Sequence, residues 1–109
     1  MLYKLAALSG GSAVLLGAFG AHALKGIEPA LLSTWTTASH YHLAHSIVLL
    51  HAAAKDPASA AARLLAAGTV LFSGSLYLLV LTRVKALGAI TPIGGLLLAS
   101  GWAALALGN

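Results

Sequence analysis

The chain has 109 residues, of which 60% are hydrophobic and only 7% are charged, whereas a soluble domain usually carries about 25% charged residues. So few charges could not cover a water-facing surface, which excludes an ordinary soluble domain. The net charge of +4 comes from lysines and arginines that are scattered between apolar runs, so they form no basic patch for nucleic-acid binding. The absence of cysteine excludes disulfides, thiol catalysis, iron–sulfur clusters and thiolate zinc sites.

The charged residues divide the chain into four apolar runs, at residues 5–24, 29–54, 64–82 and 86–109. A membrane-spanning helix needs about 20 apolar residues, and each run approaches or exceeds that length. We therefore predict an all-α membrane protein that forms a single domain over residues 1–109, with four transmembrane helices near 4–24, 34–54, 63–82 and 88–107. The links are short, so neighbouring helices should be antiparallel, in an up-down-up-down bundle.

The first predicted helix has two features of a signal peptide. Lys4 precedes an apolar stretch, and the alanines on either side of His22 resemble the small residues of a cleavage site. We rank that alternative below a spanning helix. Lysine and arginine are divided three and three between the two predicted faces of the membrane, so the positive-inside rule does not decide the orientation. The N-terminal amine favours a cytoplasmic location for both termini.

The second apolar run is longer than a membrane span requires. Residues 29–36 are predicted to lie partly in the membrane interface, with Trp35 as a headgroup anchor, so that the spanning part begins near Thr37. Asp56 and Pro57 predict the end of this helix and a restart before the third.

The fourth helix is predicted to begin with Thr91 as its N-cap and Pro92 in its first turn. Helices in a bilayer associate through close packing of small residues, and the first, third and fourth helices carry such residues. The glycines expected to mediate this packing are Gly17, Gly20, Gly74 and Gly95.

Four of the five histidines fall within "SHYHLAHSIVLLH", residues 39–51, on the second helix. Successive residues of an α-helix are rotated by about 100°. His42 and His45 therefore share one face of this helix, whereas His40 and His51 share another.

A three-histidine site at one end of the bundle is the main candidate site. His22 lies at the loop end of the first helix, and antiparallel packing should bring it close to His42 and His45. Three imidazoles, with Tyr41 beside them, could bind a divalent metal, a haem iron, a quinone or a lipid headgroup. The alternative is structural, because the same imidazoles could form hydrogen bonds across helix interfaces to hydroxyl groups of the third helix. The sequence does not decide whether the cofactor is haem, a divalent metal or none.

The sequence contains no recognisable catalytic constellation. The only acids, Glu28 and Asp56, lie in predicted loops, so a proton pump with an intramembrane carboxylate is disfavoured and a serine–histidine pair has no acidic third member. Neither a phosphate-binding loop nor a dinucleotide fingerprint occurs. We therefore predict that the protein is not an enzyme.

Five segments occur in a characteristic order: "GAFGAHAL" (17–24), "TASHYHLAHSIVLLH" (37–51), "GTVLFSGSLYLL" (68–79), "ITPIGG" (90–95) and "GW" (101–102). With these segments the chain resembles, over nearly its whole length, the transmembrane protein 256-like family, also catalogued as domain-of-unknown-function family 423. The resemblance implies four transmembrane helices in a small protein of bacterial inner membranes or mitochondria. It implies little about activity, because the family has no agreed biochemical function. His22 and His45 match the family pattern best, whereas position 42 varies between histidine and glutamine, which weakens His42 as an obligatory metal ligand.

Our first prediction for function is a small membrane binding module that uses the site at His22, His42 and His45. The second is a structural or assembly subunit of a larger membrane complex, and an oligomeric channel or transporter ranks third because four short helices leave little room for a pore. We expect a multi-pass protein of the bacterial cytoplasmic membrane that contacts the lipid bilayer and forms a homo-oligomer or joins a membrane complex.

Overall fold

The computed structural model describes residues 1–108, and every regular element within them is helical. The elements follow one another as α1 (Leu2–His22), α2 (Pro29–Lys55), α3 (Ala60–Thr82), the short 3₁₀ helix η1 (Lys85–Ala89) and α4 (Thr91–Ala106). The four predicted α-helices are confirmed as helices, although α2 begins earlier than predicted and α4 begins later. η1 fills most of the link between α3 and α4.

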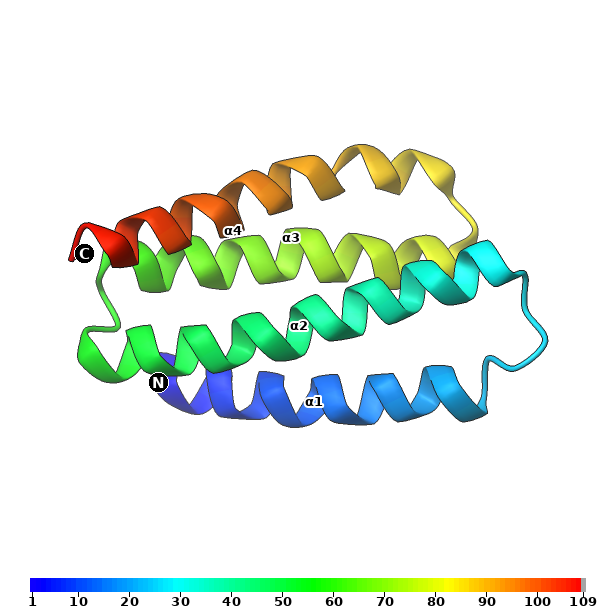
Figure 1. The fold of residues 1–109 in the computed structure, drawn as a ribbon, viewed down its shortest axis with the longest axis horizontal. Coiled ribbons are helices and arrows are strands. Elements are labelled where there is room, and N and C mark those ends of the chain that lie inside the picture. The colour runs from blue at the N-terminus through cyan, green and yellow to red at the C-terminus, as the bar shows by residue number, and fades with distance from the viewer. Residues whose placement is uncertain (109) are drawn as a thin grey trace.

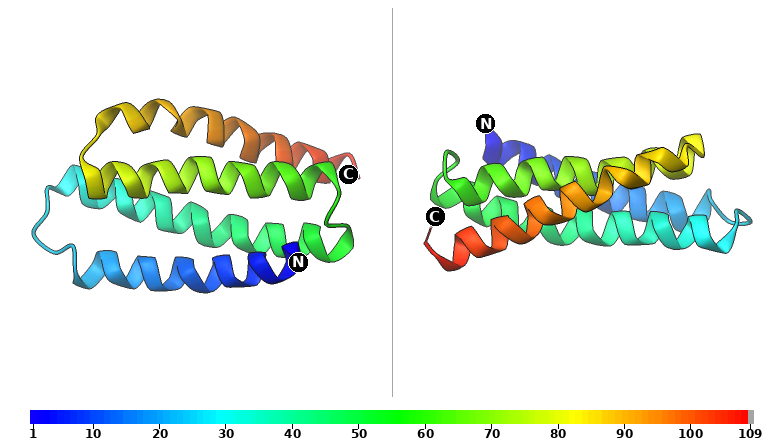
Figure 2. Two further views of the ribbon diagram at one scale, coloured as in Figure 1. Left: turned by 180° about the vertical axis from the view of Figure 1, so that it is seen from behind. Right: turned by 90° about the horizontal axis from the view of Figure 1, so that it is seen from above.

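The helices lie side by side in chain order, and the chain reverses direction at every link (Figure 1). α2 packs against α1 and α3, and α3 packs against α4, whereas α1 and α4 occupy opposite edges of the molecule (Figures 1 and 2). Seen from above, α4 crosses the other helices obliquely (Figure 2). α2 lies between α1 and α3, and both of these helices pack against it. This interior helix holds four of the five histidines.

The link between α2 and α3 is fixed by side-chain caps. The carboxylate of Asp56 accepts a hydrogen bond from the backbone N–H of Ala58 at 2.9 Å, and the hydroxyl of Ser59 accepts one from the backbone N–H of Ala62 at 3.1 Å. The bond to Ala62 satisfies an amide group that the first turn of α3 leaves without a partner, and the bond to Ala58 closes a tight turn before that helix. The predicted helix end and restart at this point are confirmed.

The other end of the molecule is held by an exposed ion pair. Arg83 ends α3 in the left-handed conformation, with φ at 61°, and its guanidinium lies 3.2 Å from the carboxylate of Glu28. The pair joins the link after α3 to the link after α1. Surface ion pairs of this kind stabilise a fold by less than about 1 kcal/mol, so this contact positions the links and contributes little energy.

The start of α4 differs in one respect from the prediction. Pro92 lies in the first turn, as predicted, and its fixed φ suits that position. Thr91 is not the N-cap, because α4 begins with this residue and its hydroxyl lies 2.6 Å from the hydroxyl of Ser75 on α3. The side chain of Thr91 therefore forms a hydrogen bond between α3 and α4, and it does not cap the N-terminus of α4.

Trp35 is buried, so its predicted role as a headgroup anchor is wrong. Only 2% of the residue is exposed, and its indole N–H donates a hydrogen bond to the backbone carbonyl of Leu16 at 2.7 Å. The ring also packs against Phe19 and Tyr77. The helix already begins at Pro29, and this turn of α2 packs between α1 and α3.

Close helix packing depends on glycine at several positions, of which two are tightest. A Cβ added at Gly94 would collide with the backbone of Phe72, and one added at Gly20 would collide with the ring of Trp35. Of the other glycines predicted to pack, Gly17 and Gly95 make only ordinary van der Waals contacts, and Gly74 faces open space. Gly68 and Gly101 complete the tight set, against Leu98 and Leu65.

Three segments are long and apolar enough to cross a membrane, namely Leu2–His22, Ala60–Thr82 and Lys85–Ala106. The segment that contains α2 is not among them, although α2 has 27 residues. Its histidines, serines and threonines account for the difference. The structure therefore supports a membrane protein in which one helix, placed in the interior of the row, is distinctly more polar than the rest.

Candidate functional site

His42 lies at the centre of a hydrogen-bond chain that joins three helices. Its Nε2 atom lies 2.9 Å from the hydroxyl of Ser9 on α1, and its Nδ1 atom lies 2.9 Å from the hydroxyl of Tyr77 on α3. The Ser9 hydroxyl lies 2.7 Å from that of Ser46, which donates in turn to the backbone carbonyl of His42 at 2.6 Å. The chain of bonds thus returns to the residue from which it starts.

The direction of every bond in this chain follows from the bond between the Ser46 hydroxyl and the backbone carbonyl of His42. Because the carbonyl can only accept, Ser46 donates its single proton there and must accept from Ser9. Ser9 then has no proton left for His42, so Nε2 carries the proton and donates. The Nδ1 atom of a neutral imidazole is left as an acceptor, and Tyr77 donates to it.

His45 is fixed in the opposite tautomer. Its Nδ1 atom donates to the backbone carbonyl of Tyr41 at 2.8 Å, and its Nε2 atom accepts from the indole N–H of Trp102 on α4 at 3.0 Å. Indole nitrogen only donates, so Nε2 cannot carry a proton while this bond exists. His45 is buried and neutral in this arrangement, and it joins α2 to α4.

The three-histidine site predicted from the sequence does not form. The bond between Ser9 and His42 sets the relative depth of α1 and α2, and His22 lies at the far end of α1, roughly 20 Å further along at 1.5 Å per residue. Within residues 1–108 no group of three histidine, cysteine or acidic side chains could hold a metal ion. His42 and His45 also point towards different helices, so the structure contradicts the predicted convergence.

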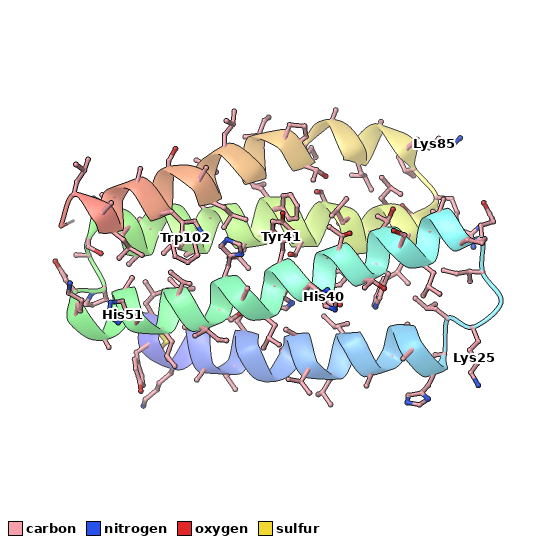
Figure 3. All side chains as sticks on the ribbon, in the orientation of Figure 1. Lys25, His40, Tyr41, His51, Lys85 and Trp102 are labelled. Atoms are coloured by element: carbon pink, nitrogen blue, oxygen red, sulfur yellow. The ribbon has the colours of Figure 1, made fainter. Side chains whose placement is uncertain are left out.

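A cleft that opens sideways between α2 and α4 is the largest cavity described. Its volume is about 650 Å³. Helices α2, α3 and α4 contribute its lining residues, which are His40, Tyr41, Ala44, His45, Phe72, Gly95, Leu98, Ala99 and Trp102. We call it the lateral cleft. Figure 3 shows Tyr41 and Trp102 on the side where α2 approaches α4.

Aromatic rings form the walls of the lateral cleft. The ring of Tyr41 stacks on that of Phe72 with centroids 4.5 Å apart, and it lies nearly parallel to the His45 ring at 5.6 Å. Trp102 meets His45 edge-on at 5.9 Å. Within the described residues, neither the hydroxyl of Tyr41 nor the imidazole of His40 has a hydrogen-bond partner, so two polar groups remain free at the rim of an apolar space.

Several of these residues were not predicted as site residues, although the segments that carry the family resemblance include Phe72 and Trp102. Phe72 and Trp102 lie on separate helices, and no spacing rule links them to the histidines of α2. Ser9 is one of the small residues of the first helix, which were expected to serve close packing and not hydrogen bonding. Gly74 opens a second, smaller groove of about 280 Å³ beside His42, between α1 and α3, where tight packing was expected.

The comparison with known families assigns the chain. The family model described as "Protein of unknown function (DUF423)" matches residues 16–95. The chain belongs to the DUF423 family. The matched region contains all five histidines and Tyr41, but it ends before Trp102.

Curated relatives extend the match to most of the chain. A UPF0382 membrane protein of Staphylococcus aureus (strain bovine RF122 / ET3-1) is 46% identical over 104 residues, which cover 90% of this chain and 85% of the relative. The UPF0382 membrane protein YwdK of Bacillus subtilis is 44% identical, covering 83% and 80%. A UPF0382 membrane protein of Schizosaccharomyces pombe is 38% identical, covering 95% and 97%. No solved structure matches the chain. This DUF423 chain is therefore a multi-pass membrane protein of an uncharacterised family.

Proposed function

We propose that this protein is a membrane binding module whose lateral cleft takes an apolar ligand of the quinone class, a planar ring with carbonyl oxygens and a hydrocarbon tail. All four helices cross the bilayer in this proposal, α2 included. The cleft supports it by size and chemistry, since small-molecule sites have volumes of about 300–1,000 Å³, largely apolar walls and a few polar groups. The observation that carries the proposal is a pair of polar groups, on Tyr41 and His40, that have no hydrogen-bond partner within residues 1–108 and lie at the rim of a cleft lined by aromatic rings.

The geometry disfavours the other ligands considered for this chain. A metal or haem iron needs free imidazole nitrogens, and both ring nitrogens of His42 and of His45 already have hydrogen-bond partners. His40 is free, but within residues 1–108 no group of three histidine, cysteine or acidic side chains could hold a metal ion. A lipid headgroup would lie at the end of a helix, whereas the cleft residues of α2 lie near its middle. A quinone ring needs only hydrogen-bond donors and an apolar slot at that depth.

Each wall of the lateral cleft would have a distinct part in binding. The Tyr41 hydroxyl, and the imidazole of His40 in its neutral form, can each donate to a carbonyl oxygen. The ring of Trp102 offers an apolar face for the ring of the ligand. Beside it, Gly95 and Ala99 present little side-chain volume on α4, which leaves room for a hydrocarbon tail that extends into the lipid.

Tryptophan fluorescence tests the proposal in purified protein. A short-tailed benzoquinone should quench emission saturably, because Trp102 lines the lateral cleft. Ala99→Phe should weaken this binding at least tenfold by filling the space. Ala67→Phe places the same ring at an exposed position of α3 outside the cleft and should leave binding unchanged. Linear quenching that is equal in all three proteins would show partitioning into detergent and would overturn the proposal.

A structural or assembly role is the second candidate, and the hydrogen bonds of His42 and His45 favour it. They join α2 to α1, α3 and α4, as interhelical hydrogen bonds do in membrane proteins. This candidate requires no ligand. It would gain support if no quinone bound while the protein was recovered from native membranes with a defined larger complex.

A further inference from the structure

The outward face of α2 carries a stripe of residues with heptad spacing. The stripe consists of Ser33, Thr37, His40, Ala44, Ile47 and His51, with intervals that alternate between four and three residues. All six residues are exposed. At 1.5 Å per residue the stripe is roughly 27 Å long, close to the thickness of a bilayer core. We call it the outer stripe of α2.

The outer stripe is more polar than the other outward faces, although it includes the apolar residues Ala44 and Ile47. α1 exposes Leu8 at 67% and Leu15 at 72%, α3 exposes Val70 at 69%, and α4 exposes Leu96 at 71%. These side chains suit contact with lipid. The outer stripe instead presents two hydroxyl groups and two imidazoles at positions where, if α2 crosses the bilayer as proposed above, they would face hydrocarbon.

The polar groups of the outer stripe have no partners within residues 1–108, where no hydrogen bond involves the side chain of Ser33, Thr37, His40 or His51. The inward polar groups of the same helix differ, since Ser39 and Ser46 both donate to backbone carbonyls. An unpaired polar group in hydrocarbon is costly, and intramembrane histidine almost always faces a protein or water-filled interior. The hydroxyls of Ser33 and Thr37 can turn back to carbonyls of their own helix, as that of Thr34 does, so it is the two imidazoles of the outer stripe that require a cover.

We propose that the outer stripe of α2 binds the outer stripe of a second copy of this chain, in a parallel pair related by a two-fold axis along the membrane normal. A two-fold interface brings identical residues together at equal depth, and heptad spacing keeps one seam in contact between two parallel helices. Small residues at Ser33, Thr37 and Ala44 let the two backbones approach closely.

Self-complementarity at His40 selects a second copy over an unrelated partner. A neutral imidazole has one donor and one acceptor nitrogen, so while no ligand occupies the lateral cleft two such rings at the same depth can bond to each other, one donating and one accepting. Hydroxyl groups at Thr37 can pair in the same manner. His40 and Ala44 also line the lateral cleft, so a quinone bound there would compete with the partner copy for His40. The stripe carries no net charge when its histidines are neutral, so like charges do not oppose each other across the axis.

Cysteine crosslinking tests the pairing cleanly, because the natural chain contains no cysteine. Thr37→Cys and Ile47→Cys lie on the outer stripe and outside the lateral cleft, so the result does not depend on quinone binding. In liposomes that contain only this protein, mild oxidation should convert each variant to dimer at least fivefold more efficiently than the controls Leu15→Cys and Val70→Cys, which are exposed on α1 and α3. Equal crosslinking at all four positions, or none, would overturn the proposal.

Substitution of His40 supplies a second measurement. In a single-molecule photobleaching assay in liposomes, His40→Leu should weaken dimerisation roughly 3- to 30-fold, as expected for loss of an interhelical hydrogen bond. His40→Gln keeps one donor and one acceptor and should retain most of the dimer. Because residue 40 is exposed in the monomer, neither change removes a contact of the fold. Unchanged dimerisation in His40→Leu, or a monomer that crosslinks only to a different protein in native membranes, would contradict pairing between copies.

Discussion

His42 and His45 are one helical turn apart, yet they hold their protons on opposite ring nitrogens. The hydroxyl chain through Ser9 places the proton of His42 on Nε2, while Trp102 forces the proton of His45 onto Nδ1. The assignments follow from three rules, that a carbonyl only accepts, that an indole only donates and that a hydroxyl has one proton, applied to neutral imidazoles. Neighbouring side chains, and not the ring itself, therefore decide the tautomer at each position.

Nitrogen NMR of protein labelled in histidine should detect the two tautomers directly. We expect the half-buried ring of His42 to be protonated at Nε2 and the buried ring of His45 to be protonated at Nδ1, both neutral. In Trp102→Phe the Nε2 atom of His45 loses its donor, so only the signal of that ring should shift. Identical tautomers for the two rings, or a shift of the His42 signal in this variant, would show that the inferred bond directions are incorrect.

Substitutions at residue 42 should separate hydrogen bonding from metal ligation. His42→Gln retains one donor and one acceptor, so it should preserve most of the stability. His42→Leu leaves the hydroxyls of Ser9 and Tyr77 without their partner and should lower the free energy of unfolding by about 1–3 kcal/mol. Denaturant titration in detergent micelles measures both values. Equal losses in the two variants would argue that the shape of the imidazole matters more than its hydrogen bonds.

Helix packing depends on a few positions where backbones approach closely. The sequence places small residues along three helices, but it does not show which of them face a neighbour, because the rotation of each helix is set by its partner. Gly20 was expected to pack and lies against Trp35, whereas Gly74 lines a groove. Gly68, Gly94 and Gly101, which were not predicted as packing glycines, lie at the tight points.

A matched pair of glycine substitutions tests this element-level account. Gly94→Ala would place a Cβ about 2.7 Å from the Cα of Phe72, so α3 and α4 must move apart, and we expect a loss of about 1–3 kcal/mol in the free energy of unfolding. Gly74→Ala meets no atom within 4 Å and should be neutral or slightly stabilising, since alanine favours helix. Thermal unfolding of the two variants side by side compares them, and a larger loss at residue 74 would refute the packing described.

For the whole molecule, the sequence predicts the membrane character, the four helices and their order, because charge spacing and apolar run length are local properties. It does not predict which histidines converge, because that depends on the depth at which helices pair. Ser9 and His42 fix this depth for α1 and α2, and they leave His22 exposed at one end. The same limit explains why Trp35 was mistaken for an interface anchor.

The lateral cleft could not be predicted from the sequence either, because it combines residues from α2, α3 and α4 that no sequence motif connects. Its polar rim lies on α2 and its apolar wall on α3 and α4. The remaining polar groups of the interior are bonded, as no buried side-chain nitrogen or oxygen within the described residues lacks a partner. Ligand chemistry at the cleft would therefore depend on Tyr41 and His40.

Photolabelling with a light-activated benzoquinone, followed by peptide mass spectrometry, tests the central claim most directly, because it reports where the ligand lies as well as whether it binds. Our account predicts that the label attaches to cleft residues such as Tyr41, Phe72 and Trp102, and that an excess of unlabelled quinone suppresses it. Label distributed over the lipid-facing leucines of α1 and α3, and insensitive to competitor, would contradict it.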